Sequence, residues 1–362
     1  MLITSDDSRH DLLTPLDDSF HQENVSPHLF RSGNPRWFHE TAWFWWFVPE
    51  HGIGGWLYNW VRPNIGTTGG GAWVWDGTAF SHLEVPYYGC YSNLELARNA
   101  DLRDHRYPSG VTVKCVEPLT TYKLGFADRD LFTLDLEFRA VMPPWVGNPV
   151  GEPLQAIHLD QVGRVTGEVT IRGQRHDVDC LAIRDRTWSP RPERWKDGHV
   201  GYANACNDDT AFLVSSAAGL RGEVEERVHS GYYLKDGRRA RIVDGTRVLE
   251  RDPEHGFLRR ITVDATDGDG RRLLAVGEGI SRMAMPIPGV HGVVWTSIVD
   301  WKIDGKQAWG EDQDAWPLHG WSEFRRAQRG LANLAGWSEA DNGRKNPDVQ
   351  RQTMVAPLTT GS

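Results

Sequence analysis

The stretch that decides the fold is VTGEVTIRG, residues 165–173. In an extended chain every second side chain shares a face, because successive side chains of a strand point to opposite sides. The stretch ends at Gly173, and glycine readily adopts the positive φ angle that a tight hairpin turn requires. We therefore expect a half-buried strand followed by a hairpin, with its inner face made of Val165, Gly167, Val169 and Ile171.

The same combination of alternation and turn signal recurs along the chain. The best helix candidate is 322–336, where Ser322 is a candidate N-cap and apolar residues recur every three or four positions. Many short strands joined by regular turns predict an all-β fold of the sandwich or barrel type with few short helices. The turn signals are Asp76-Gly77, Asp236-Gly237, Asp267-Gly268 and Asp304-Gly305, with Arg172-Gly173 in a similar place.

The chain has 362 residues, which favours two domains. The run Ser189-Pro190-Arg191-Pro192 interrupts the strand pattern, so we place the boundary in the region 175–195 and set it at residue 180. The polar ends lack periodicity and are expected to be loosely ordered. The predicted organisation is an N-terminal segment 1–25, β domains over 26–180 and 181–337, and a polar tail 338–362.

Composition excludes several function classes. The formal net charge of −9 disfavours nucleic acid as a partner. The four cysteines lack metal-site spacing, and we expect free buried thiols. We find no signal peptide and no apolar run long enough to span a membrane, so we expect a cytoplasmic protein. The glycine run 69–71 lacks the lysine of a phosphate-binding loop and is interpreted as a turn, and we expect neither a metal nor a cofactor.

Tryptophan is unusually abundant. The chain has 17 Trp residues, and many of them lie between Trp37 and Trp75. Such a density builds either a thick core or the wall of a cavity for a large apolar ligand, since each indole carries a large apolar area and one donor. The candidates for substrate binding are Trp43, Trp45, Trp56, Trp73 and Trp188, together with Asp160.

A candidate acid lies in the strand that ends at Trp188. Alternation places Asp185 on the same face as Leu181 and Ile183, and the neighbouring arginines on the other face. Apolar surroundings disfavour a charged carboxylate and raise its pKa, which suits a proton donor. The alternative is a structural Asp held ionised by Arg184, Arg186 or Arg191.

Two further residues are candidate catalytic groups. His158 shares a face with Asp160 on the preceding strand-like run, and a His within reach of Asp185 shuttles a proton or orients water. Otherwise it is a core or loop His. Glu40 precedes the Trp-rich run 43–46. If it points inward it is a second acid in an aromatic pocket, and if outward it is a solvated carboxylate.

The stretches HLDQVGRVTG (158–167) and RDRTWSPR (184–191) resemble the lipocalin-like hydratase superfamily. That group includes the carotenoid 1,2-hydratases and relatives among terpenoid cyclases and fungal pericyclases. The resemblance implies two lipocalin-like β-barrel halves over about 35–325 with an apolar ligand cavity. It puts Asp185 where the hydratases keep an Asp proposed to protonate a carbon–carbon double bond, and His158 near a family His.

The match departs from the hydratase pattern at three positions. Ile183 stands in place of a Tyr, Asp160 in place of a Trp, and Ser189 in place of a Gly. The chain therefore looks closer to a bacterial subgroup of the superfamily than to the carotenoid hydratases themselves.

Three functions compete. The first is a cofactor-independent enzyme that carries out acid-initiated hydration, dehydration, isomerisation or cyclisation of a hydrophobic terpenoid, steroid-like or polyketide substrate. The second is a carrier or sensor with the same Trp-lined cavity and no chemistry. The third is a carbohydrate-binding or glycosidase-like protein, which needs exposed Trp rings and two carboxylates across a cleft, such as Glu40 and Asp185.

Overall fold

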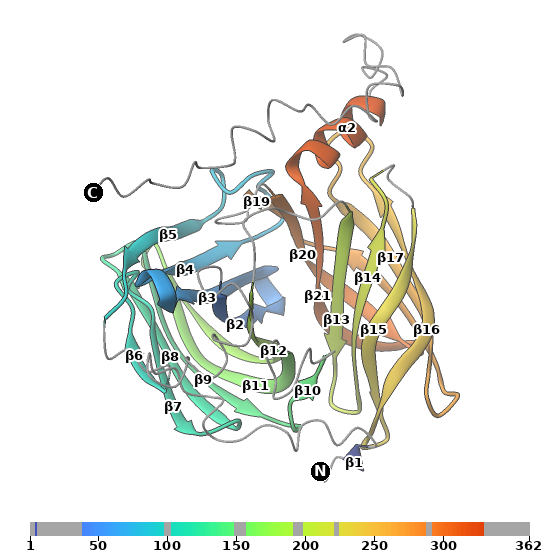
Figure 1. Ribbon diagram of the computed structural model, residues 1–362, viewed down its shortest axis with the longest axis horizontal. Helices are drawn as coiled ribbons and strands as arrows, with labels where there is room; N and C mark the ends of the chain where they lie inside the picture. Colours follow the sequence, from blue (N-terminus) through green and yellow to red (C-terminus); the bar gives the residue numbers. More distant parts are fainter. Residues whose placement is uncertain are drawn as a thin grey trace, which may run out of the picture.

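The computed structural model describes residues 4–5, 38–97, 103–147, 157–190, 198–220, 224–286 and 292–328. Most of these residues lie in strands of two large sheets, so the predicted all-β class is confirmed. The helices that the described ranges contain are α2 (Leu318–Gln328) and the short 3-10 turns η4 (Pro49–His51) and η5 (Pro63–Ile65). Figure 1 shows the two sheets side by side, with α2 at one end of the second.

The first sheet is antiparallel and strongly curved (Figure 1). Its centre is the long hairpin of β11 and β12, in which Ile171 pairs with Gln174 across the turn. In spatial order the strands are β5 (Tyr87–Glu95), β4 (Thr67–Trp75), β3 (Ile53–Arg62), β2 (Phe38–Val48), β12 (Gln174–Pro190), β11 (Ile157–Ile171), β9 (Phe132–Ala140), β8 (Thr121–Asp128), β7 (Thr112–Glu117) and β6 (Asp104–Arg106), and β10 (Trp145–Val146) pairs with β11.

The second sheet closes on itself as a barrel, because β16 pairs with both β15 and β17. Closure leaves no free sheet edge among those strands. In spatial order the strands are β1 (Thr4–Ser5), β16 (Arg238–Arg251), β15 (Glu225–Lys235), β14 (Thr210–Ala218), β13 (His199–Cys206), β21 (Lys306–Pro317), β20 (Gly292–Ile303), β18 (Arg272–Gly279) and β17 (Leu258–Asp267), and β19 (Met283–Pro286) pairs with β20.

The tight hairpins predicted from sequence are found at three of the five places. Both residues of Arg172-Gly173, Asp236-Gly237 and Asp304-Gly305 have positive φ angles, as a primed turn requires. At Asp267-Gly268 the turn is longer, and its positive φ is at Gly270. At Asp76-Gly77 the chain leaves β4 without a tight hairpin, since β5 begins only at Tyr87.

Two other sequence expectations are wrong. The glycine run 69–71 is not a turn but part of β4, where Gly70 has φ +118° and a Cβ atom there would lie 2.0 Å from the Tyr58 carbonyl oxygen. The run therefore permits close backbone approach within the sheet. The helix begins at Leu318, directly after Pro317, so Ser322 lies inside α2 and is not its N-cap. Residues 329–336 of the expected helix lie outside the described residues.

The passage from the first sheet to the second lies after Pro190. The predicted boundary at residue 180 falls inside β12, which stays paired with β2 up to Pro190, and the second sheet resumes at His199. The strand signal persists through the charged run 184–186, and only the prolines end it. Most of the predicted end segments, 1–25 and 338–362, also lie outside the described residues, apart from Thr4–Ser5.

The second sheet has buried residues on both of its faces. One face lines the barrel with a core of its own, which includes Phe212, Ile261 and Trp301. The other packs against the first sheet, and its Leu213 and Ile298 belong to the large core of that sheet. The region between the sheets is thus built from two sequence-distant halves. The cysteines are free, and Cys180 and Cys206 are buried.

Candidate active site between the two sheets

A row of cross-strand partners brings the predicted acid to the face that meets the second sheet. Asp160 on β11 pairs with Asp185 on β12, Asp185 pairs with Trp43 on β2, and Trp43 pairs with Tyr58 on β3. Residues directly opposite each other in antiparallel strands share a face, so these four side chains lie on one side of the sheet. The alternation that predicted the direction of Asp185 therefore also brings Asp160 and Trp43 beside it.

Tyr202 of β13 completes the row from the second sheet. Its hydroxyl donates a hydrogen bond to Asp160 Oδ1. Its ring contacts those of Trp43 and His158 edge-on, with centroid separations of 6.3 and 6.2 Å. Burial and the charges of Asp160 and Asp185 hold the pKa of Tyr202 well above its usual value, so the phenol stays protonated and remains a donor.

His158 links the buried carboxylate to solvent. Its Nε2 lies 2.9 Å from Asp160 Oδ2, and its Nδ1 lies 2.7 Å from the Oγ1 of Thr187, its cross-strand partner. The His158 side chain is 35% exposed, whereas that of Asp160 is fully buried. A proton can thus pass between the interior and water through the imidazole ring.

We call His158, Asp160, Asp185 and Tyr202 the acid cluster. One ligand atom from each of His158, Asp160 and Asp185 lies within 4.8 Å of the others. Such a set has the donor types of a divalent-cation site. Both oxygens of Asp160 are already engaged, one by Tyr202 and one by His158, and this arrangement suits proton transfer better than metal binding.

The structure does not bring Glu40 to the acid cluster. Glu40 pairs with Trp188, which lies three residues after Asp185 on the same strand. Because successive side chains of a strand alternate, Glu40 and Trp188 point to the face of the sheet opposite Asp185. Glu40 is buried and its Oε2 lies 3.1 Å from Arg186 Nη2, while the Arg186 guanidinium stacks 5.2 Å above the ring of Trp188. Glu40 and Trp188 are both buried on that face.

The arginines flanking Asp185 also point to that opposite face. The Arg184 guanidinium lies 4.2 Å above the ring of Tyr122, and its Nε donates to Gln161 Oε1 at 2.8 Å. Arg186 contacts Glu40 as described above. Alternation therefore points Arg184 and Arg186 to the face opposite Asp185. Arg191, the third arginine of the structural alternative, lies outside the described residues.

The remaining predicted tryptophans form a wall beside the acid cluster. Trp45, Trp56 and Trp73 are cross-strand partners on the same face as Trp43, and all are buried. Trp43 and Trp56 meet edge-on at 5.6 Å, and Trp56 meets Trp73 at 6.1 Å. These rings pack against the second sheet, where Phe47 contacts Trp309 at 5.7 Å.

Glu311 of β21 is a buried carboxyl that sequence analysis missed. The Trp56 indole donates to its Oε1 at 2.8 Å, and the Thr296 hydroxyl donates to the same oxygen. Burial raises the pKa of Glu311 to about 8, so it is mostly protonated at neutral pH. Sequence analysis also missed Tyr202. Glu311 and Tyr202 reach the site from the second sheet, so no local sequence motif marks either residue.

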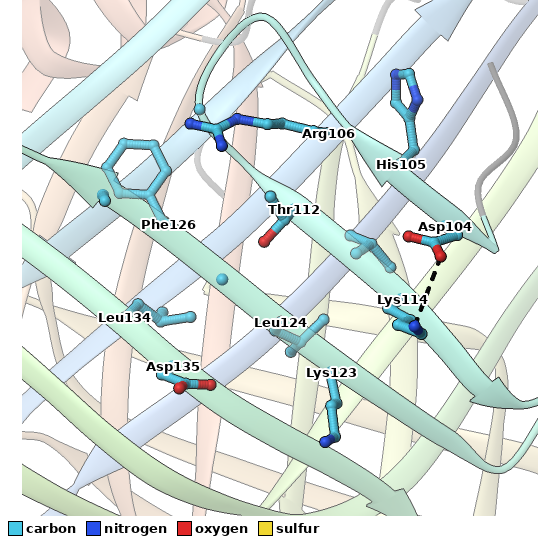
Figure 2. A pocket seen from close by; sticks show the side chains of 14 residues that line it. Asp104, His105, Arg106, Thr112, Lys114, Lys123, Leu124, Phe126, Leu134 and Asp135 are labelled. Atoms are coloured by element: carbon cyan, nitrogen blue, oxygen red, sulfur yellow. Dashed lines mark ion pairs between the residues drawn. The ribbon is translucent and has the colours of Figure 1, made fainter. Parts of the chain in front are cut away.

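A separate surface pocket of about 440 Å³ lies over β6, β7, β8 and β9 (Figure 2). Its labelled side chains include Lys114, which pairs with Asp104, and Phe126. None of the residues lining this pocket belongs to the acid cluster.

The chain was compared with known proteins. Kievitone hydratase from Nectria haematococca is 8% identical over 80% of this chain and 90% of its own, with a TM-score of 0.47. CghA is 10% identical over 76% and 87%, also with a TM-score of 0.47. An AttH candidate from Nitrosomonas europaea is 14% identical over 78% and 92%, with a TM-score of 0.46.

No curated protein matches the chain in sequence. Within the described residues, no helix is both long and apolar enough to cross a membrane. A family match extends over residues 22–316 and so covers most of the chain. The chain belongs to the family described as Domain of unknown function (DUF7064).

Proposed function

We propose that this protein is an enzyme that transfers a proton to a carbon–carbon double bond of a hydrophobic small molecule, which leads to hydration or isomerisation. Dehydration and cyclisation use the same first step or its reverse. The observation that carries the proposal is the acid cluster, in which two carboxylates, an imidazole and a phenol meet between two apolar sheets.

Asp185 is the proton donor in this proposal. One ligand atom of Asp185 lies within 4.8 Å of those of Asp160 and His158, so a proton can move among the three side chains. Asp160 holds Tyr202 with one oxygen and His158 with the other, which suits a positioning role. The resemblance of residues 184–191 to the hydratase pattern supports the same assignment.

His158 returns the proton. In hydration, Asp185 protonates one carbon, water adds to the cation at the other, and His158 accepts the proton that the water releases before returning it to the cluster. In isomerisation, the cation instead loses a proton from a neighbouring carbon to His158. The edge-on contact of Trp43 with Tyr202 places aromatic surface beside the acid, and ring faces stabilise positive charge.

A carrier without chemistry is the second candidate, and it requires the same aromatic wall. The carbohydrate alternative has less support, because Trp43, Trp45, Trp56, Trp73 and Trp188 are buried instead of exposed. Glu40 and Asp185 also lie on opposite faces of one sheet and do not face each other across a cleft.

Mass spectrometry separates the enzyme from the carrier. The hydrophobic molecules that co-purify with the protein are extracted, identified and incubated with fresh protein in heavy water. An enzyme that protonates carbon incorporates deuterium at carbon and generates a product of altered mass. Recovery of every extracted molecule unchanged and without carbon-bound deuterium would support the carrier and reject the proposed enzyme.

A further inference from the structure

A second polar row faces the acid cluster from the barrel side. Tyr232 on β15 pairs with Leu213 on β14, Leu213 with Asn204 on β13, and Asn204 with Glu311 on β21. Cross-strand partners share a face, and Leu213 and Tyr232 belong to the core that includes the first sheet. Tyr232, Asn204 and Glu311 therefore point between the sheets, towards the row that carries Asp185.

Three hydrogen-bond donors in this region have no partner within the described residues. They are the Tyr232 hydroxyl, the Asn204 side-chain amide and the Trp43 indole N–H. Their residues are only 0%, 1% and 2% exposed. Buried polar groups are nearly always hydrogen-bonded, because an unmade bond costs stability. A ligand with an acceptor atom in this region would satisfy these three donors.

The three donors are neighbours of the acid cluster. Trp43 is the cross-strand partner of Asp185, and its ring contacts that of Tyr202. The Tyr232 ring lies 5.7 Å from that of Trp145, which is the cross-strand partner of Asp160. Burial and the nearby charge of Asp160 hold the pKa of Tyr232 well above its usual value, so its hydroxyl keeps its proton and remains a donor.

We propose that Tyr232, Asn204 and Trp43 bind the carbonyl oxygen of the substrate, which is therefore a hydrophobic α,β-unsaturated ketone or a close chemical relative. This inference rests on the proposed function, because it names the substrate of the same site. An unprotonated acceptor oxygen matches three donors, and a carbonyl oxygen is such an acceptor.

The carbonyl makes the proton transfer easier to explain. With an α,β-unsaturated ketone the order of the steps reverses: water adds first to the β carbon, the electron pair of the double bond moves to the oxygen, and an enolate forms in place of the carbocation. Donors held in place around that oxygen stabilise its developing charge. Asp185 then supplies the proton to the α carbon, and His158 accepts the proton lost by the water. Atoms and charge balance without any further reactant.

A matched pair of probes tests the carbonyl site without requiring turnover. Trans-chalcone and trans-stilbene share two phenyl rings and a double bond, but only chalcone carries a carbonyl. Their affinities are measured by quenching of Trp fluorescence, and the carbonyl stretch of bound chalcone by infrared spectroscopy. We expect the protein to bind chalcone roughly tenfold more tightly than stilbene, with the stretch at lower frequency than in an apolar solvent.

Tyr232→Phe should reduce the chalcone preference severalfold and shift the stretch back. Tyr233→Phe is the matched control, because that hydroxyl donates to Asp304 at 2.9 Å and its ring lies in the separate core inside the barrel. It should leave the preference unchanged. Equal affinities for the two probes, or the same preference in Tyr232→Phe, would overturn the carbonyl site and mean that water satisfies these donors.

The outcome is independent of the proposed catalysis. A chalcone preference without any transfer of deuterium to carbon leaves the carbonyl site in place and rejects the enzyme. Deuterium transfer to extracted molecules with no chalcone preference keeps the enzyme and rejects the carbonyl substrate. Unfolding temperature gives a check on folding. Tyr232→Phe removes a hydroxyl that has no partner among the described residues, so the ligand-free variant should be at least as stable as the parent.

Discussion

Two buried glutamates on neighbouring structural layers have opposite protonation behaviour. Glu226, inside the barrel, has its pKa lowered to about 2, because the Arg247 guanidinium and His199 outweigh the effect of burial. Glu311, between the sheets, has its pKa raised to about 8, chiefly by burial and to a lesser extent by the charge of Asp312, and the hydrogen-bond donors beside it, such as Trp56, are neutral. A glutamate is thus a charged ion-pair partner inside the barrel and a mostly neutral acid between the sheets.

Glu311→Gln should leave stability near neutral pH almost unchanged, since the native carboxyl is already mostly neutral. The folded pKa of about 8 exceeds the ordinary value of 4.5, so the native state binds an extra proton between these values and loses stability as pH rises through that window. Urea unfolding at a series of pH values should show this decline flattened in the variant. Glu226→Gln should instead be strongly destabilising at pH 7. A variant profile parallel to that of the parent would contradict the protonation of Glu311.

At the scale of elements, the part of β12 from Cys180 to Trp188 has two largely buried faces with different tasks. One face carries Asp185 to the acid cluster. The other carries Arg184 and Arg186 into a buried core, where Arg186 pairs with Glu40. A strand that is buried on both faces keeps only one register, because a slip by one residue would exchange the two sets.

Glu40→Gln should lower the free energy of unfolding by about 3 kcal/mol, because it removes a buried carboxylate charge from beside the buried Arg186 guanidinium. Chemical denaturation measures this loss, and adding Arg186→Gln should recover part of it. Proton transfer by the folded single variant should persist, since Glu40 faces away from Asp185. Complete loss of transfer in a stable Glu40→Gln protein would return Glu40 to the catalytic group.

At the scale of the whole molecule, the end of the barrel nearest α2 holds a buried charge network. Its anions are Glu226, Asp312 and Asp314, and its cations are Arg247, Arg251 and, when protonated, His199. Trp316 stacks on the His199 ring at 4.0 Å and on Phe324 of α2 at 5.1 Å, which covers the network. Charges balance only when His199 carries its proton.

Stability should therefore fall as the pH rises past the ordinary His value of 6.5. Burial alone would lower the pKa of His199, but Asp314 and Glu226 outweigh it and raise the pKa. A raised folded pKa contributes stability that is fully present below 6.5 and is lost as pH rises through the folded value. The difference in unfolding free energy between the parent and His199→Gln, followed from pH 5 to about pH 9, should shrink with increasing pH. A constant difference would mean that His199 is neutral in the folded protein.

The sequence predicted what depends on local periodicity. Alternation identified the strands, the direction of Asp185 and its separation from the arginines, and Asp-Gly pairs marked two tight hairpins. Alternation also placed His158 and Asp160 on the same face as Asp185, because β11 and β12 form one hairpin and pair along the whole length of β11. Pairings between sheets have no such local signal. Tyr202, Tyr232 and Glu311 reach the site through the packing of two sheets. The direction of Glu40 was left open by the sequence, because an aromatic run does not tell which face of the sheet its neighbour serves.

The central claim is that Asp185 delivers a proton to carbon. The most direct test is the initial rate of deuterium incorporation from heavy water into the co-purified substrate, compared between the parent protein, Asp185→Asn and Asp179→Asn. Asp179 lies on the same strand, is 59% exposed and pairs with Arg164, so it controls for the loss of one β12 carboxylate. We predict that Asp185→Asn remains folded and loses at least about 99% of the rate, while Asp179→Asn retains it. A folded Asp185→Asn protein with the full rate would contradict the account.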